Sequence, residues 1–109
     1  MTMTPMQRNK ILRAYRAELA ETLGGALDAM ILYGSHARGE DRADSDMDVL
    51  CVIRGPFDYG ELIARTSEPT ARLSLEYGVV LSRAFVPREA YETHQLPFLM
   101  NVRREGITV

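Results

Sequence analysis

The chain opens with apolar residues at helical spacing. The recurring positions are Leu12, Tyr15, Leu19 and Leu23. Residues three or four positions apart share one face of a helix, so this pattern predicts a helix with a single buried face. Thr4 is a candidate N-cap and Pro5 suits the first helical position, while Gly24-Gly25 ends the run. We expect this helix to pack on a sheet.

Three shorter apolar runs predict β-strands. They are residues 26–33 (ALDAMILY), 47–53 (MDVLCVI) and 79–86 (VVLSRAFV). The second run is apolar on both faces, which is typical of a central strand covered on both sides. Because side chains alternate along a strand, Leu50 and Val52 should continue the face that carries Asp48. Cys51, the single cysteine, is expected to be a buried and unreactive thiol.

The segments between these runs carry helix signals. Asp58 followed by Glu61 resembles a capping box, and the apolar residues up to Gly78 predict one helix or a pair, kinked or divided at Pro69. Further helical segments are expected at residues 34–39, 87–91 and 97–105. The resulting α-β-α-β-α-β-α order predicts an α+β fold, with helices packed on a small mixed sheet.

Length and charge exclude several classes of protein. At 109 residues we expect a single domain, residues 1–109, with no room for a second substrate-binding domain. The formal net charge of −2 argues against a direct nucleic-acid binder, which would need a strongly basic face. No apolar run approaches the length of a membrane span, and residues 1–10 lack the apolar core of a signal peptide. A cytoplasmic protein without membrane contact is therefore expected.

The candidate chemistry begins where the first strand ends. Gly34 allows the backbone to turn sharply, and Ser35 opens a helical turn whose N–H groups and hydroxyl suit phosphate oxygens. Arg38 and Arg42 follow in the connecting segment, and their planar guanidinium groups suit phosphate as well. Taken singly, a Gly-Ser after a strand is an ordinary turn, and loop arginines are ordinarily solvated.

A pair of carboxylates follows at the start of the second strand. Asp46 and Asp48 are two positions apart, so both side chains should project from one face, roughly 6.6 Å apart. Neighbouring carboxylates repel unless a cation lies between them. Mg²⁺ fits, since it takes one or two carboxylates together with substrate phosphate oxygens. An Asp-x-Asp alone is more often a solvated strand end, and only its combination with Gly34-Ser35 predicts a nucleotide site.

The pattern G-S-x10-D-x-D, with A-R-G inside it and D-S-D-M-D at its end, resembles the nucleotidyltransferase superfamily of the DNA polymerase beta type. The short chain resembles its minimal nucleotidyltransferase (MNT) branch, the antitoxins of HEPN/MNT toxin–antitoxin pairs. This resemblance implies that Gly34 and Ser35 hold the triphosphate of ATP and that Asp46 and Asp48 ligate Mg²⁺. It also implies transfer of AMP (AMPylation) to a hydroxyl, with tyrosine as the expected acceptor, of a HEPN toxin ribonuclease.

One position departs from the family pattern. Active members of the superfamily commonly carry a third acidic residue on a later strand, and its counterpart here is Ser82, with no carboxylate in residues 79–86. Glu76 and Glu89 only flank that strand. Two alternatives therefore stay open: a catalytically impaired binding module that masks the toxin stoichiometrically, and a transferase for a small molecule such as an aminoglycoside. We expect residues 96–106 (LPFLMNVRREG) to provide the face that binds the partner.

Overall fold

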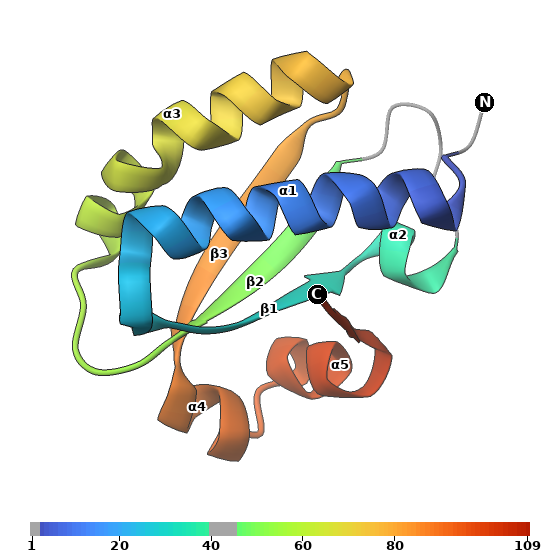
Figure 1. Ribbon diagram of the computed structural model, residues 1–109. Helices are drawn as coiled ribbons and strands as arrows, with labels where there is room; N and C mark the ends of the chain where they lie inside the picture. The colour runs from blue at the N-terminus through green and yellow to red at the C-terminus, as the bar shows by residue number, and fades with distance from the viewer. Residues whose placement is uncertain (1–2, 40–45) are drawn as a thin grey trace.

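The computed structural model describes residues 3–39 and 46–109, which form a mixed sheet with helices on both faces (Figure 1). The strands are β1 (Leu27–Tyr33), β2 (Met47–Ile53), β3 (Leu81–Pro87) and β4 (Ile107–Thr108). The helical elements are α1 (Pro5–Leu23), the 3-10 turn η1 (Gly24–Ala26), α2 (Ser35–Arg38), α3 (Tyr59–Tyr77), α4 (Arg88–Thr93) and α5 (Pro97–Glu105). The α+β class is confirmed.

The order of strands across the sheet is β3-β2-β1-β4. Strand β2 runs antiparallel to β1 and parallel to β3. The start of β2 therefore lies beside the end of β1 and the start of β3. This arrangement brings three segments that are far apart in the sequence to one end of the sheet.

The sheet separates two layers of core. Helices α1 and α3 cover one face (Figure 1). The residues of β2 buried in that layer are Met47, Val49, Cys51 and Ile53. On the opposite face Leu50 and Val52 pack against α5, so the alternation predicted for β2 is confirmed. Burial raises the pKa of Cys51 to about 12, which agrees with an inert thiol.

The predicted helix boundaries have local causes. The Thr4 hydroxyl accepts a hydrogen bond from the Gln7 amide at 3.1 Å, and the Gln7 side chain accepts one from the Thr4 amide at 3.0 Å, which closes a capping box. At the start of α3 the Asp58 carboxylate accepts a hydrogen bond from the Glu61 amide at 2.9 Å. Helix α3 continues through Pro69 to Tyr77, so the alternative of two separate helices is wrong.

The sequence does not predict β4, which pairs with the outer edge of β1. Gly106 makes this pairing possible, because a Cβ atom at that position would collide with the Ile31 side chain and the Val102 carbonyl. The Val109 amide then donates to the Met30 carbonyl at 2.9 Å. In the part of the chain described here, no helix combines the length and the apolar character that a membrane span requires.

Candidate active site

The Gly34-Ser35 turn lies directly against one of the two aspartates. Gly34 adopts φ +79° and ψ −157°, and its carbonyl accepts hydrogen bonds from Ala37 and Arg38, which begin α2. A Cβ atom added to Gly34 would lie 2.9 Å from Asp48 Oδ2. Both the backbone conformation and this close approach require glycine. The structure therefore brings the predicted phosphate turn and Asp48 together.

Asp48 is the middle member of a row across the sheet. It pairs with Tyr33 of β1 on one side and with Ser82 of β3 on the other. Paired residues of neighbouring strands project from the same face, about 4.8 Å apart. Ser82, which the family resemblance gives as the counterpart of the third acidic residue, thus lies next to Asp48 across the sheet.

Burial and a neighbouring carboxylate disfavour the charged form of Asp48. Burial raises the pKa of Asp48 above its ordinary value, the Asp46 carboxylate raises it further, and His36 lowers it. No ion pair to Asp48 is found among the described residues. Asp46 is exposed just before β2, close enough for its charge to act on Asp48. Two adjacent carboxylates with unbalanced charge are a donor set that fits Mg²⁺.

These two aspartates would hold a cation only with help from a ligand. Within residues 3–39 and 46–109 no cluster of three or more His, Cys, Asp or Glu side chains could hold a metal ion. Glu76 of α3 and Glu89 of α4 are both exposed and flank β3 rather than standing in the row. Phosphate oxygens of a nucleotide are the ligands that would complete such a site.

Of the two predicted arginines, Arg38 lies beside the site. It ends α2, and its Nη1 atom is 3.8 Å from Glu105 Oε2 at the end of α5. The guanidinium thus connects the phosphate turn to α5. Arg42 lies outside the described residues, so its predicted contact with phosphate stays a prediction.

Tyr33 is the member of the site that the sequence reading missed. Its ring meets Phe98 of α5 edge to face, with centroids 5.2 Å apart and planes at 83°. Burial and, after it, the Asp48 carboxylate raise the pKa of Tyr33. The signal in the sequence was the position of Tyr33 as the last strand residue before Gly34. Antiparallel pairing of β1 with β2 places that residue beside Asp48.

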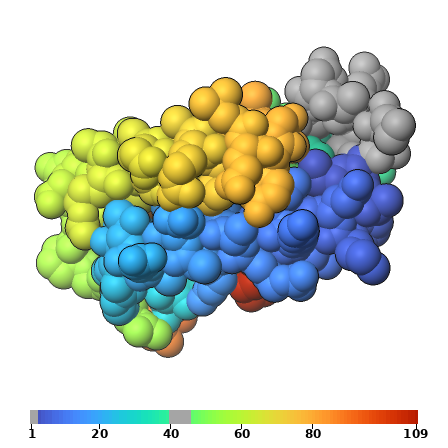
Figure 2. All heavy atoms as spheres, turned by 45° about the horizontal axis from the view of Figure 1, so that its top comes forward, coloured from blue at the N-terminus to red at the C-terminus, as the bar shows by residue number. Residues whose placement is uncertain are grey.

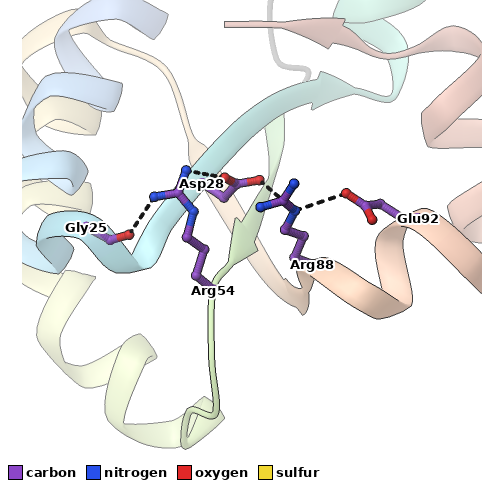
Figure 3. A network of polar contacts seen from close by, with 5 residues as sticks. All are labelled: Gly25, Asp28, Arg54, Arg88 and Glu92. Atoms are coloured by element: carbon purple, nitrogen blue, oxygen red, sulfur yellow. Dashed lines mark hydrogen bonds and ion pairs between the residues drawn. The ribbon is translucent and has the colours of Figure 1, made fainter.

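A cavity of about 810 Å³ lies at the opposite end of the sheet, where β2 and β3 finish. Three of its charged residues are in ion pairs, because Arg54 and Arg88 both contact Asp28 and Arg88 also contacts Glu92 (Figure 3). A site whose charges are mutually balanced has little unmet demand for a charged ligand. We therefore place the candidate active site at Asp48 and not at this cavity.

Comparison with known proteins agrees with the geometry. Residues 12–102 match the family described as "Nucleotidyltransferase domain". Two proteins of Methanocaldococcus jannaschii, both provisionally named protein adenylyltransferases, are similar along nearly their whole length. One is 30% identical over 102 residues, covering 93% of this chain and 96% of the relative. The other is 28% identical over 104 residues, covering 95% and 100%.

Solved structures share the fold at 15% sequence identity. A toxin–antitoxin crystallised with AMP-PNP has a TM-score of 0.58 and is matched over 86% of this chain and 68% of its own. A provisionally named nucleotidyltransferase from Sulfolobus solfataricus has a TM-score of 0.55, with 99% and 89% covered. A mutant of the MntA–HpeT toxin–antitoxin has a TM-score of 0.54, with 92% and 69% covered. The match over residues 12–102 and the near full-length similarity show that this chain belongs to the nucleotidyltransferase domain family.

Proposed function

We propose that this chain is an MNT-type antitoxin that transfers AMP from ATP to a hydroxyl, on a tyrosine, of a HEPN toxin ribonuclease and thereby neutralises it. The observation that carries the proposal is the close approach of the Gly34 turn to Asp48. It brings backbone N–H groups that suit phosphate next to a carboxylate whose pKa is raised by burial and by Asp46. Membership of the nucleotidyltransferase family supports it. So do the relatives named as protein adenylyltransferases and the structural likeness to toxin–antitoxin proteins.

Each residue has a distinct role in this proposal. Gly34 and Ser35 seat the triphosphate, since the first N–H groups of a helix and a hydroxyl favour phosphate oxygens. Asp46 and Asp48 hold Mg²⁺, which when bound neutralises charge on the phosphates. Arg38 balances charge at the edge of the site, and Arg42 has the same role by its place in the sequence.

The reaction is a displacement at the α-phosphorus of ATP. The acceptor oxygen forms a bond to the α-phosphorus, the bond from that phosphorus to pyrophosphate breaks, and the hydroxyl proton passes to solvent. The protein's part is to orient the triphosphate and to exclude competing geometries. Ser82 is a poor base near neutral pH, so the chain itself offers little help with the proton.

The test uses a candidate HEPN ribonuclease partner, ATP labelled at the α-phosphate, and Mg²⁺. We expect label on the ribonuclease, loss of its RNA cleavage, and no labelling by an Asp46→Ala, Asp48→Ala double variant. Absence of label with the native chain, or equal labelling by the double variant, would contradict the enzymatic function.

Ser82 beside Asp48 favours a second candidate, a binding module that neutralises the toxin without catalysis. The same double variant separates the two functions. If it restrains the ribonuclease as fully as the native chain at equal stoichiometry, masking explains the neutralisation. If restraint is lost together with labelling, catalysis explains it.

A further inference from the structure

Helix α2 is too short to fix the Gly34 turn by itself. It has four residues, and no side chain caps its N-terminus. The Ala37 and Arg38 amides donate to the Gly34 carbonyl at 3.1 and 3.2 Å. A single helical turn is unstable in water unless tertiary contacts hold it. The turn that we propose as the phosphate site therefore depends on neighbouring elements for its position.

One of these neighbours is the layer formed by α1 and α3. The two helices lie side by side (Figure 2), and Ala37 of α2 packs against the buried residues of this layer. This contact supports α2 from one face of the sheet only. Tyr33 and Asp48 belong to the other face, where they continue the alternation of the buried residues Ile31 and Leu50. Any support on that face has to come from a different helix.

Helix α5 reaches both ends of the turn on that face. Phe98 meets the ring of Tyr33, the residue directly before Gly34, edge to face with centroids 5.2 Å apart. Glu105 Oε2 lies 3.8 Å from Nη1 of Arg38, the last residue of α2. Positions 98 and 105 are two helical turns apart, so both side chains lie on one side of α5. That side of the helix contacts the residue before the turn and the residue that ends α2.

Helix α5 is itself fixed to the part of β1 that leads into the turn. Val102 of α5 and Ile31 of β1 are buried in the same layer of core. Gly106, directly after α5, fits closely against the Ile31 side chain. In β4, Ile107 then pairs with Leu32 of β1. These contacts give α5 a set position from which its side chains can hold the turn.

We propose that α5 positions the phosphate turn, with Phe98 and Glu105 as its positioning residues. Phe98 holds the end of β1 and Glu105 holds the end of α2, so the backbone N–H groups between them keep one arrangement. Phosphate then binds without first having to order the turn. The inference rests on the proposed nucleotide binding for its purpose. It gives residues 96–106 a role beside the partner face expected from the sequence, which stays a prediction.

Amide hydrogen exchange, followed by NMR, tests the positioning without nucleotide. In a Phe98→Leu, Glu105→Gln pair the Ala37 and Arg38 amides should exchange about tenfold faster, because their hydrogen bonds open more often. Amides at the centre of β2 should keep their native exchange rates, which a general loss of stability would not allow. The matched control is Met100→Leu, at a 45% exposed position of α5 against 46% for Phe98, and it should change neither set of rates.

Titration calorimetry with ATP and Mg²⁺ gives the second measurement. The Phe98→Leu, Glu105→Gln pair should raise Kd about fivefold, because the binding-competent turn is less populated. Phe98→Tyr keeps the ring and should retain the native Kd, as should Met100→Leu. In transfer assays the pair should raise KM for ATP and leave kcat within about twofold, since it changes binding of the triphosphate and not the aspartates.

The positioning role is overturned if exchange in α2 stays native, or if it rises no more than exchange in β2. It is also overturned if the native chain binds ATP and the Phe98→Leu, Glu105→Gln pair binds it equally well. If the native chain binds no ATP but the pair still speeds exchange in α2 alone, the proposed nucleotide function fails and the positioning of the turn stands.

Discussion

Asp28 and Asp48 are both strand aspartates, but they lie at opposite ends of the sheet in opposite electrostatic surroundings. Arg54 Nη2 is 2.6 Å from Asp28 Oδ1, and Arg88 Nε is 3.7 Å from Asp28 Oδ2 (Figure 3). At Asp48 burial and the Asp46 carboxylate raise the pKa, and His36 lowers it by less than burial raises it. Asp28 therefore has two arginine partners, whereas no ion pair to Asp48 is found among the described residues.

The balanced aspartate has a structural role. Asp28 belongs to β1, Arg54 follows β2 and Arg88 opens α4, so the three charges tie together three elements. Arg54 also donates from its amide to the Ala26 carbonyl at 2.8 Å. Within the described residues Asp48 forms no such tie, and a partly buried carboxylate with a raised pKa beside a second carboxylate is typical of functional sites.

The largest expected effect is that substitution of Asp48 lowers activity and raises stability, whereas substitution of Asp28 lowers stability and leaves activity nearly unchanged. Asp48→Asn should lower AMP transfer at least about 100-fold, since it removes a metal ligand. The same change should raise Tm in Mg²⁺-free buffer, because it removes a partly buried charge beside Asp46. Asp28→Asn should leave transfer within about twofold and lower the free energy of unfolding by about 1 kcal/mol. AMP-transfer assays and thermal melts on both variants test this prediction. An equal loss of AMP transfer in the two variants would contradict the assignment of a functional role to Asp48 and a structural role to Asp28.

A smaller effect concerns the contact that brings the turn to Asp48. Gly34→Ala places a methyl group 2.9 Å from Asp48 Oδ2 in a conformation that only glycine adopts readily. It should cost about 1–3 kcal/mol in stability and weaken ATP binding about tenfold or more. The control is Gly39→Ala, which has φ +72° but nothing within 4 Å. It should cost about 1–2 kcal/mol and leave ATP binding unchanged, as titration calorimetry and chemical denaturation would show.

The smallest effects should come from the two arginines around Asp28. Both side chains are more than half exposed, so solvent screens their ion pairs. Arg54→Ala should lower the free energy of unfolding by less than about 1 kcal/mol. Arg88→Ala should lower it by less than Arg54→Ala does, because Arg88 is farther from Asp28 and shares its charge with Glu92. Urea denaturation of the single variants gives the order, and the reverse order would contradict the assigned geometry.

Local signals predicted much of the fold. The caps at Thr4 and Asp58 and the exact span of β2 follow from residues adjacent in sequence, where side-chain chemistry and period decide the outcome. The Gly34 turn and the Asp46–Asp48 pair are also local patterns. We expect them to meet because the two motifs together resemble a nucleotide site, and the antiparallel pairing of β1 with β2 is the structural reason that they do.

The features that the sequence reading missed depend on strand order and register. Nothing near Ile107 signals a strand of two residues, since its pairing rests on the close fit of Gly106 against β1. Tyr33 joins the site only through antiparallel pairing with Asp48. The Asp28 network unites residues from β1, from after β2 and from α4, so no spacing within one segment reveals it.

The outer edge of β3, where backbone amides are already hydrogen-bonded to side chains, affects how the protein behaves in concentrated solution. The Leu81 and Phe85 amides of β3 already donate to the Ser74 and Tyr59 hydroxyls, and Pro87 has no amide hydrogen. The strand at the opposite edge of the sheet is β4, which has only two residues. Among the described residues these contacts occupy part of each edge of the sheet, which disfavours the addition of strands from a second molecule. Crowding should therefore favour separate globules over fibrous aggregates.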